Sequence, residues 1–151
     1  MKNKDKEEIE KIIKEFFNKM GFEAEIERSE EKESTFSLNL KTPEPQMLIG
    51  RAGATLIEIQ KILGKILRKK IGRALFLDLD INGYKKNKIE YLKDLAQATA
   101  DEVSLEKKEK ALPPMPSYER RIVHLALANR EDVQTQSQGE EPERRVVIKP
   151  K

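Results

Sequence analysis

Two short motifs in this sequence contain residue types that suit the binding of an anion. The first is Gly-x-x-Gly, formed by Gly50, Arg51, Ala52 and Gly53. Because glycine lacks a Cβ, the backbone there can approach a phosphate chain closely, and the amides at the start of a following helix point toward the anion. Gly-x-x-Gly is common by chance, but here an apolar segment precedes it and an amphipathic helical pattern follows. We therefore interpret residues 50–53 as a phosphate-binding loop.

The second motif is Arg-x-x-x-His, formed by Arg120 and His124. Residues four apart share one face of a helix, so the pair would present a guanidinium beside an imidazole. Arginine offers a phosphate a planar fork of donors, and histidine adds another donor. An isolated pair of this kind is usually incidental, but here basic residues accompany it. We include Arg121, Arg144 and Arg145 as supporting candidates for the same phosphate site.

Apolar and basic side chains flank the glycine loop. Ile49, Leu56 and Ile57 are candidates for the floor of a groove on which bases could rest. Lys61 and Lys65 would extend the positive charge along the helix that follows the loop. These residues, together with the loop backbone, form the predicted nucleic-acid site of the first half of the chain.

Charge is distributed unevenly along the chain. Residues 1–34 contain eight Lys or Arg and eleven Asp or Glu, a net charge of −3. Residues 50–73 contain seven Lys or Arg against the single Glu58, a net charge of +6. A polyanion would be attracted to the second region and repelled by the first. A basic helix alone is usually a solvated face, but directly after a Gly-x-x-Gly loop it favours nucleic-acid binding.

Other candidate residues carry less weight. Tyr84, Tyr91 and Tyr118 are too few and too scattered in the sequence for an aromatic ladder. Asp78 and Asp80 alternate along a predicted strand, and we interpret them as solvent-facing rather than as an acid–base or metal pair. The low aromatic content of 5% is compatible with bases that rest on aliphatic side chains.

The composition excludes several classes of site. The 151 residues include no cysteine and one histidine, which excludes disulfides, thiolate metal sites and multi-histidine metal sites. No run of about 18 apolar residues could span a membrane, and the N-terminus lacks the apolar core of a secretion signal. Nothing near the histidine completes a nucleophilic triad. We therefore expect a cytoplasmic protein that is not an enzyme and has no cofactor, no metal and no small-molecule substrate.

The hydrophobic pattern of the first half predicts the elements that would position the glycine loop. Apolar residues recur at helical spacing before and after the loop, and alternating patterns predict strands. The predicted elements are a helix over residues 5–20, a strand over 22–27, a turn over 29–33, a strand over 36–40, a helical turn around Met47, a helix from the loop to Gly72, and a strand over 75–81.

A second small α+β unit is predicted after residue 83. A helical pattern over residues 84–108 is ended by prolines, and a compact helix over 117–129 follows, with Ser117 as its N-cap. Two strands are predicted over residues 133–137 and 144–148. This second helix carries the Arg-x-x-x-His motif, and the last strand carries the paired arginines.

The two motifs and the order of predicted elements resemble known nucleic-acid-binding domains. The order α-β-β-α-α-β with a Gly-x-x-Gly loop resembles a type II KH domain. Residues 115–150 resemble an R-three-H domain, which is named for its Arg-x-x-x-His motif. A KH domain followed directly by an R-three-H domain is similar to the Jag family, also called the SpoIIIJ-associated or KhpB/EloR family. The resemblance covers nearly the whole chain and implies a KH domain over residues 1–83 and an R-three-H domain over 84–151.

The resemblance also implies a function. It implies a cytoplasmic protein that binds single-stranded RNA, with single-stranded DNA as a second candidate, and that is linked to cell elongation, cell shape and cell-wall organisation. A small single-KH protein is the implied partner. Family members commonly carry a further N-terminal Jag domain, whereas the KH-like pattern here starts near Met1. Relatives often have a polar or basic residue where Ala52 stands, so phosphate contact would fall on Arg51 and the backbone.

Two alternatives remain open from the sequence. In the first, the chain is a protein-interaction module that pairs with another KH protein, and RNA contact is incidental. In the second, the chain is a nuclease or another nucleic-acid enzyme, and we expect a metal-dependent cleavage assay to be negative. Retained RNA binding by a monomeric preparation without a partner would argue against the first alternative.

Overall fold

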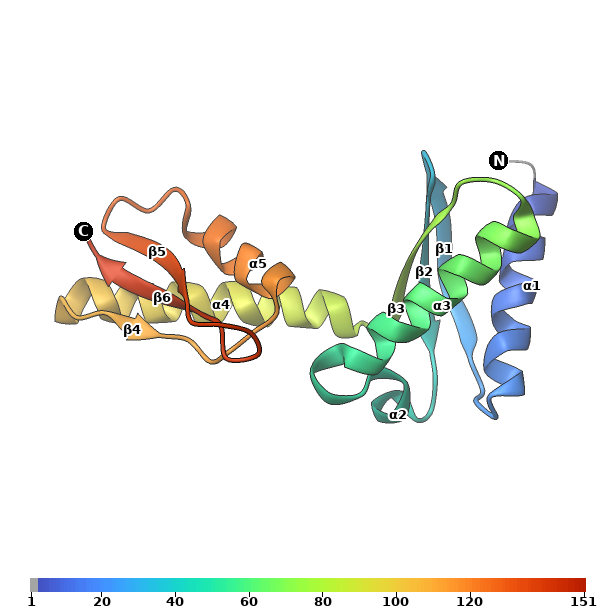
Figure 1. The fold of residues 1–151 in the computed structure, drawn as a ribbon, viewed down its shortest axis with the longest axis horizontal. Helices are drawn as coiled ribbons and strands as arrows, with labels where there is room; N and C mark the ends of the chain where they lie inside the picture. Colours follow the sequence, from blue (N-terminus) through green and yellow to red (C-terminus); the bar gives the residue numbers. More distant parts are fainter. Residues whose placement is uncertain (1–2) are drawn as a thin grey trace. The chain divides into compact units, whose positions relative to one another are not determined.

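The computed structural model describes residues 3–151, which fold into two compact units (Figure 1). Unit 1 extends to Lys85, and unit 2 covers Lys86–Lys151. Each unit packs helices against a three-stranded sheet around its own hydrophobic core. The chain is therefore a mixed α+β protein, as the sequence predicts.

In unit 1, α1 and α3 cover one face of the sheet. The strand order is β1-β2-β3, with β1 antiparallel and β3 parallel to β2. Alternate residues of the strands enter the core, where Leu38 and Leu79 are paired in register and packed with Ile13 and Leu63. The elements of unit 1 are α1 (Asn3–Lys19), β1 (Glu25–Lys32), β2 (Thr35–Lys41), α2 (Pro45–Ile49), a 3₁₀ turn (Arg51–Gly53), α3 (Ala54–Ile71) and β3 (Phe76–Ile81).

The acidic segment after residue 28 is a strand, so the predicted turn over residues 29–33 is wrong. β1 continues to Lys32, which pairs with Thr35, and only two residues remain for the turn. Glu31 is accommodated within the strand because Arg73 donates two hydrogen bonds to its carboxylate, at 2.7 and 2.9 Å. This contact lowers the pKa of Glu31. An alternation pattern gives no sign of an ion pair between residues this far apart in the sequence.

In unit 2, the helices α4 and α5 pack with a sheet of order β4-β6-β5. Both pairings are antiparallel, so β6 is the central strand. The two-residue strand β4 follows a Lys/Glu-rich segment and is not among the predicted strands. The elements are α4 (Tyr84–Glu106), whose first two residues belong to unit 1, β4 (Lys110–Ala111), α5 (Ser117–Leu127), β5 (Val133–Gln138) and β6 (Arg145–Pro150).

The predicted N-cap of α5 is also wrong by one residue. Pro116, in an extended conformation, occupies the cap position, and Ser117 is the first helical residue. The cap makes no side-chain hydrogen bond to the helix. Instead, the carbonyl oxygen of Pro116 accepts a hydrogen bond from the backbone of Arg120, so the Pro-Ser step still begins the helix.

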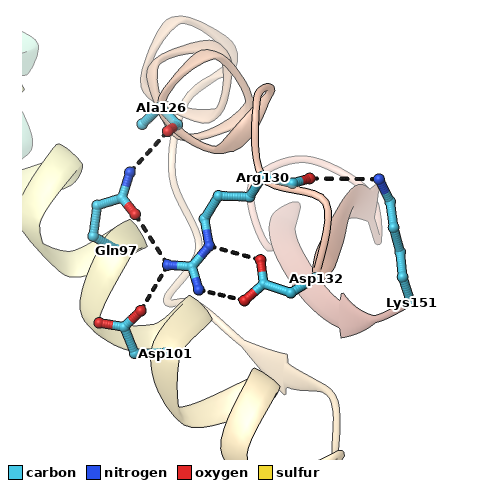
Figure 2. A network of polar contacts seen from close by, with 6 residues as sticks. All are labelled: Gln97, Asp101, Ala126, Arg130, Asp132 and Lys151. Carbon is cyan, nitrogen blue, oxygen red and sulfur yellow. Dashed lines mark hydrogen bonds and ion pairs between the residues drawn. The ribbon is translucent and has the colours of Figure 1, made fainter.

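A guanidinium joins the turn after α5 to α4 in unit 2 (Figure 2). Arg130 contacts both carboxylate oxygens of Asp132 at 2.9 and 2.6 Å and donates to Asp101 on α4 at 2.7 Å. Gln97, also on α4, accepts from Arg130 and donates to the carbonyl oxygen of Ala126. These contacts raise the pKa of Arg130 and lower that of Asp132. The network holds α5 and β5 in fixed positions on α4, which positions the Arg-x-x-x-His helix.

Candidate nucleic-acid interface

The loop between α2 and α3 requires glycine at both motif positions. Gly50 has φ 71° and ψ −176°, a conformation essentially restricted to glycine, and a Cβ there would overlap the side chain of Thr55. Gly53 has φ 79°, and a Cβ there would lie 2.9 Å from the ring of Tyr84. At both positions the backbone has a positive φ and a neighbouring side chain occupies the space of a Cβ, which explains why the motif has glycine there.

The two residues between the glycines project from the loop. Arg51 and Ala52 are both exposed. Ala52 has φ 53° and ψ 27°, a left-handed conformation that is uncommon for a residue with a Cβ. The 18-residue helix α3 begins immediately afterwards at Ala54. Its N-terminal amides and the partial positive charge of the helix dipole follow Arg51 directly in the chain, so the loop region contains both backbone and side-chain donors for an anion.

The predicted groove-floor residues fall into two groups. Ile49 and Ile57 are half-buried and still present apolar surface. Leu56 is 1% exposed and belongs to the core, so it supports the site from below and cannot touch a ligand in this conformation. Its position explains the difference, because Leu56 lies on the same face of α3 as Leu63, which packs against the sheet.

The predicted lysines on α3 are both exposed. Lys61 lies 2.9 Å from Glu58, and both side chains are largely in solvent. An exposed pair of this kind is weak, so Lys61 remains available to an anion. Lys65 is exposed as well. The electrostatic character predicted for this helix is therefore present on its surface.

A shallow groove, which is not among the predicted site features, runs between α3 and β3. Gly64 faces β3 without a side chain and leaves room there, since a Cβ at this position would be in ordinary contact with Leu77, 4.0 Å away. Phe76 lies at the rim and is 60% exposed. A glycine inside an amphipathic helix was the available signal. The groove is lined by Gln60, Lys61, Gly64, Arg68, Leu75, Phe76 and Leu77.

The strand at this groove, β3, is an edge strand whose outward-facing amides differ in their hydrogen bonding. The amide of Phe76 donates to the carbonyl oxygen of Ser34, just before β2. Because successive amides of a strand point to opposite sides, the amides of Leu77 and Leu79 point away from β2. The Leu79 amide donates to the side chain of Gln60 at 3.0 Å. The Gln60 oxygen also accepts from Lys85 at 2.6 Å. The backbone of Leu77 therefore faces the groove, whereas that of Leu79 is capped.

In unit 2, Arg120 lies below the surface. Arg120 is 8% exposed. Its Nη1 donates to the carbonyl oxygen of Met115 and to the carboxylate of Glu141, both at 2.7 Å. The Glu141 side chain is 58% exposed. The guanidinium that the sequence assigns to a phosphate thus already contacts a carboxylate and a buried carbonyl. It connects the segment before α5 to the loop between β5 and β6.

His124 points at β5 and contacts two hydroxyl groups. Its Nδ1 lies 2.7 Å from Thr135 Oγ1, and its Nε2 lies 2.8 Å from Ser137 Oγ. Burial lowers the pKa of His124, and the charge of Arg120 lowers it further. A neutral imidazole can donate at one nitrogen and accept at the other, which suits two hydroxyl partners. Arg120 and His124 are thus close together, as their spacing predicts.

The remaining predicted arginines of unit 2 are more accessible. Arg121 is exposed on α5, and Arg144 and Arg145 are half-buried around the start of β6. Arg144 donates to the carbonyl oxygen of Gly139 at 2.6 Å, and Arg145 lies 3.4 Å from Glu143. These contacts hold the two arginines against the loop between β5 and β6. Glu141, in the same loop, is the partner of Arg120.

Two kinds of feature are absent from residues 3–151. No group of three or more His, Asp or Glu side chains in this part of the chain is arranged to hold a metal ion. None of the helices described there is long and apolar enough to cross a membrane.

Comparisons with known proteins find a matching domain family for unit 2 and relatives for most of the chain. Residues 90–150 match the family model of the R-three-H domain. Over 138 residues the chain is 35% identical to a protein of Clostridium symbiosum named RNA-binding protein KhpB, covering 91% of this chain and 62% of the relative. A protein of the same name from Bacillus subtilis is 32% identical over 121 residues, covering 79% of this chain and 58% of the relative.

This chain matches a smaller share of a third relative. The protein of Lactiplantibacillus plantarum named RNA-binding protein KhpB is 36% identical over 112 residues, which is 74% of this chain and 35% of that protein. The chain thus spans between about a third and just over three fifths of these relatives. Unit 2 is similar to an R-three-H domain, and most of the chain is similar to proteins named RNA-binding protein KhpB.

Proposed function

We propose that this chain binds single-stranded RNA, with a type II KH domain over residues 1–83 and an R-three-H domain over 84–151. The observation that carries the proposal is that one helix of unit 1, α3, begins at the exposed Gly50–Gly53 loop and also lines the groove next to β3, through Gln60, Lys61, Gly64 and Arg68. The loop suits a phosphate chain, and the groove suits a base. The similarity to proteins named for RNA binding supports the same assignment.

In unit 1, the backbone of residues 50–53 and the side chain of Arg51 hold phosphates. Ile49 and Ile57 provide apolar contact, and Lys61 and Lys65 attract the strand. A base that enters the groove can form hydrogen bonds with the outward backbone of Leu77. A duplex cannot place a base in the groove in this way, because its bases are stacked and their Watson–Crick edges are paired. The proposed ligand is therefore a single strand.

In unit 2, Arg121, Arg144 and Arg145 contact phosphates, and Arg120 and His124 act from beneath. Arg120 joins the loop that leads to Arg144 and Arg145, through Glu141, to the segment before α5, through the carbonyl oxygen of Met115. His124 fixes α5 on β5. This assignment differs from the sequence-based hypothesis, which gives the phosphate to Arg120 and His124 directly.

The wider role follows from the resemblance alone. We propose that the chain acts in the cytoplasm as a regulator of cell elongation and cell-wall organisation, together with a small single-KH protein. RNA binding does not require that partner in this proposal, and no catalytic step is part of it. The names of the relatives, which refer to RNA binding, support the RNA-binding part.

Fluorescence anisotropy with a labelled single-stranded RNA tests the function in the full chain. We expect saturable binding by the monomeric protein, weaker binding of a duplex with the same sequence, and intact RNA after incubation with Mg²⁺. With about four to six phosphates neutralised, log K should fall against log salt with a slope of about −3 to −4. Equal affinity for the duplex, or no salt dependence, would contradict the proposal.

A further inference from the structure

The aromatic side chains of unit 2 lie on its surface. The core of the unit consists of Leu, Ile, Val, Ala and Met side chains. Tyr91 on α4 is 57% exposed, and Tyr118 in the first turn of α5 is 43% exposed. Exposed tyrosines are common singly, so their exposure alone assigns no function. Their mutual arrangement is more informative.

A chain of contacts links the two tyrosines, although they lie far apart in the sequence. The ammonium of Lys88 lies 5.6 Å from the ring centroid of Tyr91. The same ammonium lies 3.9 Å from the carboxylate of Glu119, to which the Tyr118 hydroxyl donates a hydrogen bond at 3.2 Å. Glu119 is 3% exposed. One buried carboxylate and one ammonium therefore hold both tyrosines in one region of unit 2 while their rings remain accessible.

Charge next to the rings indicates the type of ligand. Arg121 is exposed three residues after Tyr118, and residues at this spacing are neighbours on a helix surface. Leu125, 64% exposed, continues the same face. The region thus offers flat aromatic surface beside two cations, Arg121 and Lys88. A nucleotide in a single strand has the matching chemistry, a flat ring and an adjacent phosphate.

We propose that Tyr91 and Tyr118 form a base-stacking site of unit 2, with Arg121 and Lys88 beside it. The inference rests on the proposed function and adds a base contact to a unit whose other candidate residues contact phosphates. Stacking on a tyrosine ring accepts any base, so this site adds affinity with little sequence preference. Glu119 accepts the hydrogen bond from Tyr118 and pairs with Lys88, so it holds both side chains in place without touching the ligand itself.

Paired substitutions in the full chain separate the rings from their tethers. Tyr118→Phe and Tyr118→Leu both remove the hydrogen bond to Glu119, but only the leucine removes the ring. We expect Tyr91→Leu with Tyr118→Leu to weaken single-stranded RNA binding at least about fivefold. The corresponding double phenylalanine variant should retain affinity close to that of the unchanged protein. Thermal unfolding of both variants checks that unit 2 stays folded.

Tyrosine emission provides a second readout, because the chain contains three tyrosines and no tryptophan. RNA should quench the emission of the unchanged protein, and the double leucine variant, in which Tyr84 remains, gives the background. An abasic strand of the same length is the ligand control: it should bind the leucine and phenylalanine variants equally.

Three outcomes would overturn the inference in distinguishable ways. If the full chain binds no single strand, the proposed function fails together with the stacking site. If it binds RNA but the leucine and phenylalanine variants bind equally, only the stacking site fails. If the leucine variants lose the same affinity for the abasic strand, the rings act on the backbone or on a protein surface and do not stack on bases.

Discussion

The two units present their proposed anion-binding groups in opposite ways. In unit 1, the groups are the backbone of an exposed turn, the N-terminus of α3 and the exposed side chain of Arg51. In unit 2, the signature guanidinium of Arg120 is below the surface and already contacts Glu141. The first site is open and depends on main-chain shape. The second is supported by a buried cation whose contacts lie within the protein.

In the proposed assignment, the Arg-x-x-x-His motif marks a site without supplying its phosphate contacts. Gly50 and Gly53 are required because both have a positive φ and a Cβ at either position would meet a close neighbour. Arg120 is required, in this interpretation, because it joins the Met115 carbonyl to the loop that contains Glu141. Substitutions in unit 1 should therefore change affinity through an exposed surface, and substitution of Arg120 should first change stability.

The largest effect is expected from Gly50→Ala. The added Cβ meets Thr55, and the backbone conformation is unfavourable for any other residue, which together should cost about 3 kcal/mol of the free energy of unfolding. Gly72→Ala is the control, since Gly72 has φ 75° with open space around it, and it should cost about 1 kcal/mol. Urea denaturation measures both, and equal losses would show that the contact with Thr55 is unimportant.

Arg120→Ala should destabilise unit 2. It leaves the Met115 carbonyl without its donor, at a cost of about 2 kcal/mol. The matched variant Arg51→Ala should change stability by less than about 0.5 kcal/mol, because Arg51 is exposed. Denaturation with amide exchange assigns each loss to its unit. A stable Arg120→Ala variant with weakened RNA binding would return Arg120 to the role of a phosphate ligand.

Replacing both Arg51 and Ala52 with Asp should weaken single-stranded RNA binding at least tenfold, equivalent to about 1.4 kcal/mol. The fold should survive because both positions are exposed and aspartate tolerates the left-handed conformation of Ala52. Lys107→Asp with Lys108→Ala removes the same net charge from exposed positions in unit 2 and should have a smaller effect. Equal effects from the two pairs would mean that only total charge matters.

The stability of unit 2 should fall below neutral pH because of His124. Its pKa is lowered from the usual 6.5 in the folded protein, so the unfolded chain takes up a proton first as the pH falls. Stability should therefore decrease from pH 6.5 down to the lowered pKa. Urea midpoints across this range measure the effect. His124→Gln should remove it, and a dependence that persists in that variant would exclude His124 as its source.

The smallest effect is expected from Glu141→Gln, which tests whether the carboxylate masks Arg120. Because the guanidinium lies below the surface, the variant should bind RNA as tightly as Glu140→Gln, which makes the same charge change at the neighbouring residue. Binding titrations at low salt compare the two. A clear gain of affinity for Glu141→Gln alone would show that a phosphate can displace the carboxylate from Arg120.

Much of the fold could be predicted because periodicity reports which face of an element is buried. The predicted helix over residues 5–20 corresponds to α1, and Gly72 ends α3 as predicted. The end of β1 could not be predicted, because its glutamates resemble a turn until Arg73 pairs with Glu31. The short strand β4 is specified by pairing with β6 and not by a pattern of its own.

The candidate site could be predicted where local backbone defines it and not where packing does. Two glycines three apart indicate a turn that other residues cannot form. The spacing of Arg120 and His124 places them together, but it does not indicate that Arg120 is buried. Similarly, Leu56 and Ile57 are adjacent in the sequence, and only the packing of α3 on the sheet separates the core residue from the half-buried one.

The capped edge of β3 provides an internal reference for measuring ligand occupancy. The Leu79 amide is bonded to Gln60, so its proton should exchange with solvent slowly even in the free protein. The Leu77 amide, two residues away on the same edge, faces the groove and should exchange faster. A ligand in the groove would slow exchange at Leu77 and leave Leu79 almost unchanged. The ratio of the two rates would report occupancy from within one strand, without a label.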